Sequence, residues 1–311
     1  MTLRDWVDET RTRFREEGVA AASRESAYEL YLGGFRRLSP FYPGGENVFD
    51  REWDVLLVLD ACRVDLLRQV AALGGYPFLD RPGELVSVGS SSIEWLSRTF
   101  DEDHREAARE TAYVTGNPFS QRVLSEADLH VLDEVWRYGW DDERGTIPAR
   151  ALTDRAVATH REFGPDRMIV HYMQPHFPSV PDPLTGGMNA ETLGEGKGWE
   201  DPWEKLRRGE LSFERVWRSY ARNLEYVLDD VALLLRSLDA DRVVITADHG
   251  NAAGEWGVYG HPKVPIPVLR NVPWYETSAR DDGEYEPELE RPERGGTEEG
   301  VEDKLSALGY L

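Results

Sequence analysis

The sequence predicts an α/β/α sandwich, in which helices cover both faces of a mainly parallel central sheet. Short, mainly apolar runs alternate with helical patterns along residues 54–248, as expected for parallel strands that are buried on both faces. The 311 residues are enough for a sizeable core, and 40% of them are hydrophobic, with 10 Trp, 13 Tyr and 10 Phe. A wholly disordered acidic chain is therefore excluded.

The expected elements follow from the period of the apolar residues. Apolar runs of strand length lie at 54–60, 85–88, 112–115, 130–136, 168–173 and 242–248. Patterns with helical spacing lie at 63–73, 93–100, 150–163 and 211–237, and two further helices are expected within residues 3–37. The N-terminal helices can cover the core or dock a partner.

We divide the chain into three parts. Residues 1–47 form an N-terminal helical extension, residues 48–276 the α/β domain, and residues 277–311 an acidic tail with a short terminal helix. The acidic, Gly- and Pro-rich composition from Thr277 to Gly300 predicts disorder there. The Gly-rich stretch 185–202 predicts a mobile excursion near the site.

The charge balance limits the partners and indicates the environment. The chain has 58 Asp and Glu against 36 Lys and Arg, which gives a net charge of −22. Because phosphate backbones bind basic surfaces, nucleic acid is excluded as a partner, and anionic membranes are disfavoured. All but four of the cationic residues are Arg. This balance resembles that of haloarchaeal cytoplasmic proteins, in which salt screens carboxylate repulsion; an ordinary acidic protein from a GC-rich genome is the alternative.

Cysteine usage and hydropathy predict a cytoplasmic protein. Cys62 is the only cysteine, so the chain has no intrachain disulfide and no cysteine-rich metal site. No run approaches the roughly 18–20 apolar residues of a membrane helix, and the charged N-terminus has no apolar signal core. We therefore expect no transmembrane segment.

Polar side chains lie at the ends of three predicted strands. Asp60 ends the first strand, His171 lies in the fifth with His176 after it, and Asp248 and His249 end the sixth. Ligand sites in open parallel sheets form beyond the carboxyl ends of the strands, so we expect these side chains to lie together. Carboxylates and imidazoles suit a divalent metal, with Zn or Mn favoured over Ca or Mg. Asp60 taken alone can equally be a helix cap.

Three adjacent serines precede the helix at 93–100. The free N–H groups and the dipole at a helix start stabilise an anion, so a hydroxyl there can attack a phosphate or sulfate held on the same amides. The alternative is a serine cap, with Glu94 in the first turn of the helix.

Several segments resemble motifs of the alkaline phosphatase and sulfatase superfamily. TADHGNAAGEWGVYGHP at 246–262 is similar to its C-terminal metal motif, and LVLDACR at 57–63 to its first strand with a metal-binding aspartate. HYMQPHFP at 171–178 resembles the sulfatase segment whose histidine contacts the transferred group, and the closing LSALGYL resembles a common sulfatase ending. The matching segments cover roughly residues 53–275 in the expected order. The resemblance therefore implies an alkaline phosphatase-like fold.

The resemblance also implies roles for individual residues. The implied metal ligands are Asp60, Asp248 and His249. His176 and His261 would contact the transferred group in catalysis, or bind a second metal ion with an acid such as Asp182. One or two ions are thus expected.

Ser91 takes the place of the nucleophile when SSIEW is laid over the sulfatase C-x-P-S-R segment, with Ser90 and Ser92 as alternatives. Ser92 directly precedes the predicted helix and is then the expected cap. We expect His171 and Arg63 to contact the substrate, although Arg63 can instead pair with Asp65 or another carboxylate.

The chain departs from the sulfatases that mature a formylglycine, because Ser91 lacks the following x-Pro/Ala-x-Arg. This leaves an unmodified hydroxyl, which suits phosphoryl transfer. We therefore predict a metal-dependent hydrolase or transferase of phosphate or sulfate esters, including those of glycans or lipid head groups. The alternatives are a catalytically inactive sulfatase-like binding module, and an interaction protein that acts through its N-terminal helices and acidic tail.

Overall fold

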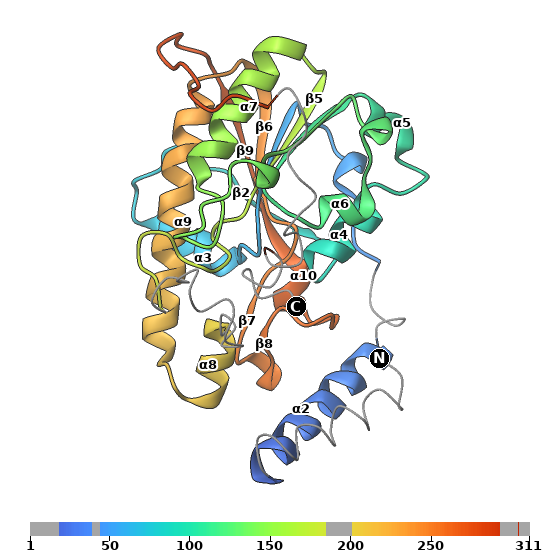
Figure 1. Cartoon of the computed structure of the whole chain (residues 1–311), viewed down its shortest axis with the longest axis vertical. Coiled ribbons are helices and arrows are strands. Elements are labelled where there is room, and N and C mark those ends of the chain that lie inside the picture. Colours follow the sequence, from blue (N-terminus) through green and yellow to red (C-terminus); the bar gives the residue numbers. More distant parts are fainter. Residues whose placement is uncertain (1–18, 39–43, 185–200, 293–303, 305–311) are drawn as a thin grey trace.

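The computed structural model describes residues 19–38, 44–184, 201–292 and 304, and it confirms the predicted α/β/α sandwich. Across the sheet, the strands are β2 (Pro82–Val86), β9 (Asn271–Ala279), β6 (Ala240–Thr246), β1 (Val55–Leu59), β5 (Arg167–Tyr172), β3 (Thr111–Thr115) and β4 (Val131–Glu134). On one face lie the helices α3 (Val64–Ala72), α7 (Ala149–Phe163) and α9 (Phe213–Leu235) (Figure 1). On the other lie α4 (Ser92–Thr99), α5 (Arg105–Arg109) and α6 (Ser120–Val123) (Figure 1). Most of the Gly-rich stretch expected to be mobile, up to residue 200, lies outside the described residues.

The parallel part of the sheet runs from β6 to β4. β1 pairs in parallel with both β6 and β5, and β3 pairs in parallel with β5 and β4. Every residue of β1 and β3 is buried, as expected for strands covered on both faces. The carboxyl ends of these strands therefore share one edge of the sheet, and the polar residues that follow them are brought together there.

The strand expected at residues 85–88 is shifted. β2 ends at Val86, lies at the edge of the sheet and pairs only with β9, in the antiparallel direction. Leu85, within β2, and Val88, two residues after its end, are both buried in the core. Their burial explains why residues 85–88 form an apolar run although the strand ends at Val86. The connection from β2 to α4 consequently begins at Ser87.

The N-terminal extension contributes α2 (Val19–Leu38), the second of the two helices predicted there; the first lies outside the described residues. Leu32 is buried in a small cluster with Val258, Val264, Ile266 and Leu269, on the loops that follow β6. Tyr28 accepts a hydrogen bond from the backbone of Tyr259 (3.1 Å). Among the described helices, none has the length and apolar character needed to cross a bilayer.

The acidic segment after residue 276 is not disordered in its described part. β9 continues to Ala279, through the boundary that we expected at residue 276. Tyr285 then donates a hydrogen bond to Asp154 of α7, and Arg155 donates to the carbonyl of Leu289 (3.2 Å). Composition could not show this, because the partners lie on a distant helix. The expected terminal helix lies outside the described residues, apart from Lys304.

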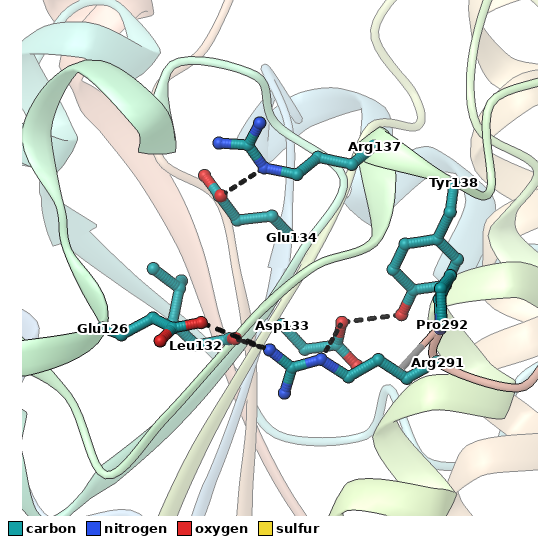
Figure 2. A pocket seen from close by; sticks show the side chains of 8 residues that line it. All are labelled: Glu126, Leu132, Asp133, Glu134, Arg137, Tyr138, Arg291 and Pro292. Carbon is teal, nitrogen blue, oxygen red and sulfur yellow. Dashed lines mark hydrogen bonds and ion pairs between the residues drawn. The ribbon is translucent and has the colours of Figure 1, made fainter. Parts of the chain in front are cut away.

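Arg291 fixes the end of this segment against β4 (Figure 2). Its guanidinium lies 3.6 Å from Glu126 and 3.9 Å from Asp133, whose other contacts are the Tyr138 hydroxyl (2.6 Å) and Arg155 (2.9 Å). All of these residues except Arg155 line a cavity of about 70 Å³. Because these charged groups are paired with one another, we interpret the cluster as a structural contact that holds the segment ending at Arg291 against β4.

Candidate functional site

Three buried side chains from two adjacent strands meet at the carboxyl edge of the sheet. Asp60 follows β1, and Asp248 and His249 follow β6. One ligand atom of each lies within 4.8 Å of the others. His249 Nε2 is 3.7 Å from Asp60 Oδ1 and 3.5 Å from Asp248 Oδ2. The structure thus brings together the three residues that the sequence predicts as metal ligands.

The donor atoms of this cluster fit a divalent cation. Asp248 Oδ1 accepts hydrogen bonds from the backbone of Ala61 (3.0 Å) and His249 (2.8 Å), whereas its buried Oδ2 has no hydrogen-bond partner among the described residues. His249 Nδ1 lies 2.8 Å from the carbonyl oxygen of Gly250, so we assign the proton to Nδ1 and the lone pair to Nε2. Two buried carboxylates repel each other unless a cation compensates them. Mixed carboxylate and imidazole donors suit Zn or Mn.

His171 is a fourth member of the cluster. Its Nε2 lies 3.8 Å from Asp60 Oδ2 and 3.7 Å from Asp248 Oδ2, and within the described part of the chain this nitrogen has no hydrogen-bond partner. Nδ1 lies 2.8 Å from the Tyr113 hydroxyl. Burial lowers the pKa of His171 to about 4, which keeps the ring neutral. We expected His171 to contact the substrate; the structure places it fully buried, with Nε2 next to the two carboxylates.

Ser92, and not Ser91, has its hydroxyl in the cluster. Ser92 Oγ lies 3.3 Å from His249 Nε2 and 3.4 Å from Asp60 Oδ2. Ser91 occupies the N-cap position of α4 but its side chain does not cap the helix, and none of the residues that the structure describes is hydrogen-bonded to its Oγ. Ser91 therefore has the cap position that we expected for Ser92. The hydroxyl that faces the cluster is that of Ser92, where we expected Ser91. The physical reason is that α4 begins one residue earlier than predicted.

Ser90 takes part in the capping contacts. Its hydroxyl and its backbone N–H both donate to Glu94 Oε2, at 2.8 Å and 3.0 Å. Glu94 thereby takes up one free N–H group before the helix, as the sequence pattern suggested. The three serines therefore have three different environments.

Two further histidines adjoin the cluster, as the sequence predicts. His176 Nε2 lies 3.0 Å from His261 Nε2, and the ring of His261 is 4.8 Å from that of His249. Burial lowers the pKa of His176 to about 4 and that of His261 well below its usual range, so both rings are neutral. Asp182, the acid suggested for a second metal ion, instead forms a bidentate ion pair with Arg215 (2.7 and 2.8 Å).

Arg63 supports the site but does not point into it. It donates to both carboxylate oxygens of Asp65 (2.8 and 2.7 Å) and to the backbone carbonyl of Asn251 (2.7 Å), and it pairs with Glu255 (2.7 Å). The pairing with Asp65 is the alternative that the sequence analysis left open for Arg63. Arg63 joins the loop after β1 to the loop after β6, and so holds the two ligand-bearing loops together.

The sequence analysis missed Asn117. This buried residue follows β3, and its Nδ2 donates to Asp60 Oδ2 (3.0 Å) while its Oδ1 accepts from the backbone of Phe119 (3.0 Å). It thereby fixes the orientation of the Asp60 carboxylate. Its position just beyond a parallel strand was the signal that could have identified it.

The cluster adjoins a cavity of about 540 Å³. Ser91 and His261 lie in its wall, together with side chains of α2 and of the segment around α6. The N-terminal extension therefore forms part of the surroundings of the site.

No protein-family model matches the chain, and no curated protein matches it. Among solved structures, it is similar to the integral membrane lipooligosaccharide phosphoethanolamine transferase A of Neisseria meningitidis (15% identity, 88% of this chain, TM-score 0.48) and spans 58% of that protein's length. It is also similar to the periplasmic domain of EptC from Escherichia coli in complex with Zn (11% identity, 76% of each chain, TM-score 0.43). A third similar structure is a complex with the substrate D-glucosamine-2-N,6-O-disulfate (13% identity, 84% of this chain and 77% of the other, TM-score 0.48). Because these similarities are weak, the function proposed below rests on the side chains of the site.

Proposed function

We propose that the chain is a metal-dependent hydrolase or transferase of phosphate or sulfate esters, with Ser92 as its nucleophile. The observation that carries this proposal is the position of the Ser92 hydroxyl, at the start of α4 and within 3.4 Å of both His249 and Asp60. The proposed ligands of a Zn or Mn ion are Asp60, Asp248, His249 and His171.

A divalent cation bound by these residues would lower the pKa of an adjacent hydroxyl and offset the charge of a substrate oxygen. Asp60 Oδ2, 3.4 Å from Ser92 Oγ, can accept the proton that the hydroxyl loses. Ser92 Oγ then bonds to phosphorus or sulfur, and the bond to the alcohol oxygen breaks. That oxygen takes up a proton, so the transfer leaves the number of protons unchanged.

The surroundings of Ser92 suit the charge that develops during this step. The first N–H groups of α4 point toward the start of the helix, where they can bind oxygens of the transferred group. His176 and His261 adjoin the same space and offer neutral ring nitrogens. Attack on the serine ester by water completes hydrolysis, whereas attack by an alcohol completes a transfer.

Paired serine variants test the nucleophile. Ser92→Ala should lower the release of p-nitrophenol from p-nitrophenyl phosphate or sulfate, assayed with Mn and Zn, by about a thousandfold or more. Ser91→Ala is the matched control and should keep at least about a tenth of the activity. Mass spectrometry of a trapped slow substrate should locate the adduct on Ser92.

Other outcomes would contradict the proposal. An adduct on Ser90 or Ser91 would reject Ser92 as the nucleophile. A metal-loaded, folded protein that turns over none of a panel of phosphate monoesters, diesters and sulfate esters would favour a binding module.

A further inference from the structure

The cavity next to the candidate site is lined by cationic side chains in a strongly acidic protein. Arg36 of α2, Arg122 of α6 and Lys263, two residues after His261, all line it, and all three are exposed. The whole chain has a net charge of −22. A concentration of positive charge in a concave surface attracts anions selectively.

These cations are available to a ligand. Within the described part of the chain, neither Arg122 nor Lys263 forms an ion pair, and the carboxylate that Arg36 approaches, that of Glu29, is 4.0 Å away. Arg122 instead lies over the ring of Phe119, with its guanidinium carbon 5.6 Å from the ring centre. Many other arginines, such as Arg63 described above, are held by carboxylates at shorter distances.

Among the described residues that line the cavity, one acid, Asp201, opposes these cations. Asp201 caps α8 (Pro202–Arg208) by accepting a hydrogen bond from the backbone of Trp203 (3.0 Å). Burial raises the pKa of Asp201 to about 7, which weakens its negative charge at neutral pH. The cavity therefore remains cationic overall.

Apolar side chains lie in the same wall. Leu32 and Phe119 are buried, and Ile93 is half-buried, directly after Ser92. Since Ser91 and His261 also line the cavity, a substrate whose transferred group lies at Ser92 can extend its remaining part into it. Such a part would contact apolar surface first and cationic groups at the rim.

We propose that this cavity binds a second anionic group of the substrate, separated by a short carbon chain from the group that is transferred. The substrate is then a phosphate or sulfate ester with a further phosphate or sulfate, not a simple monoester. This inference rests on the proposed function, because it assigns the first anionic group to Ser92. α2 becomes part of the binding site, since it supplies Arg36 and Leu32.

The test compares two ligands that differ only in the second charge. Hexyl phosphate and 1,6-hexanediol bisphosphate, and the corresponding sulfates, are titrated calorimetrically into the full-length Ser92→Ala protein loaded with Mn or Zn. We expect the ligand with two anionic groups to bind at least about tenfold more tightly, as one charge-assisted contact provides. Combining Ser92→Ala with Arg122→Gln and Lys263→Gln should bring the ratio of the two affinities close to one.

Arg109→Gln is the matched control. Arg109 is an exposed arginine on α5 that does not line the cavity, so its loss should leave the ratio unchanged. The proposal is overturned if the ratio of the two affinities is near one in the protein that retains Arg122 and Lys263. It is also overturned if the ratio stays unchanged when both residues are replaced by Gln. Failure to bind either ligand overturns it as well.

Turnover separates this proposal from the proposed function. If the protein with Ser92 releases phosphate or sulfate from the monoester and binds both ligands equally, the function stands and the second site is rejected. If the affinity ratio depends on Arg122 and Lys263 but no ester is turned over, the anion site stands and the function is rejected.

Discussion

Asp248 has two oxygens with separate tasks. Oδ1 accepts two backbone hydrogen bonds that shape the loops after β1 and β6, whereas Oδ2 faces His171 and His249. An asparagine can keep the first task through its amide oxygen, but it lacks the negative charge that a cation requires. The two tasks can therefore be separated by a single substitution.

We predict that Asp248→Asn abolishes stoichiometric metal binding and turnover while the far-ultraviolet circular dichroism stays unchanged. Metal content after dialysis, measured by mass spectrometry, is the direct readout. Asp182→Asn removes a carboxylate that is paired with Arg215 and should retain the metal. Stoichiometric metal in Asp248→Asn would show that the site lies elsewhere.

The buried histidines predict sensitivity to acid. The pKa of His171 and that of His176 fall to about 4 in the folded protein, against about 6.5 for an unperturbed histidine. Between these values the unfolded chain binds more protons than the folded one, so the stability contributed by these groups is complete above about pH 6.5 and is lost as the pH falls toward 4.

For the metal-free chain, we expect the free energy of unfolding, measured with urea, to fall by a few kcal/mol between pH 7 and pH 4.5. His176→Gln should make this dependence shallower, because one titrating group is removed. His130→Gln, at an exposed position outside the site, is the control. An identical slope in the chain with His176 and in the variant without it would refute this explanation.

The sequence predicted most members of the candidate site, but not which of the three serines has its hydroxyl in the cluster. Asp60, Asp248 and His249 could be predicted because each follows an apolar strand, and parallel strands end at one edge. The choice among three adjacent serines depends on where α4 begins, and helix starts are uncertain by a residue or two. The role of Arg63 depends on Glu255 and Asn251, which are distant in sequence and meet it only in the folded chain.

The sequence predicts the strands that are buried on both faces of the sheet, but it does not predict the bounds of the edge strand β2. β1 and β3 are apolar throughout their length, because helices cover both of their faces. β2 has mostly exposed or half-buried residues and pairs only with β9, the strand that runs antiparallel to the others, and neither feature leaves a strong pattern in five residues. The position of an edge strand depends on its partner, β9, which lies nearly 190 residues later.

The loop after β6 packs too closely for a side chain at Gly250. A Cβ there would lie 2.2 Å from the carbonyl oxygen of Val268, in α10 (Pro267–Arg270), while the Gly250 N–H donates to the carbonyl of Leu269 (2.9 Å). Because His249 precedes this glycine, displacement of the loop also moves a proposed metal ligand.

Gly250→Ala should therefore lower both the free energy of unfolding, by about 1–3 kcal/mol, and the affinity for Mn or Zn. Denaturation and metal titration measure the two effects. Gly75→Ala is the control, since nothing lies within 4 Å of a Cβ at that position. Equal stability and metal affinity in Gly250→Ala and the unsubstituted chain would contradict this account of the loop.

Charge is distributed in opposite ways over the whole molecule and around the site. The net charge of −22 makes the folded chain repel itself, whereas the cavity beside the cluster is lined by Arg36, Arg122 and Lys263. Salt screens both effects. The halophilic environment that we propose from the composition would therefore stabilise the fold and weaken long-range attraction of anionic substrates at the same time.

We predict that the melting temperature rises between about 0.1 M and 1 M KCl, where the Debye length shortens from about 10 Å to 3 Å. Over the same range, the affinity for 1,6-hexanediol bisphosphate should decrease more than that for hexyl phosphate, because the bisphosphate makes one more contact between opposite charges. Sucrose at matched osmolality controls for effects of water activity, and should not reproduce the loss of selectivity. A melting temperature that stays flat or falls in KCl would reject the halophilic interpretation, since self-repulsion at this net charge would then not limit the stability of the fold.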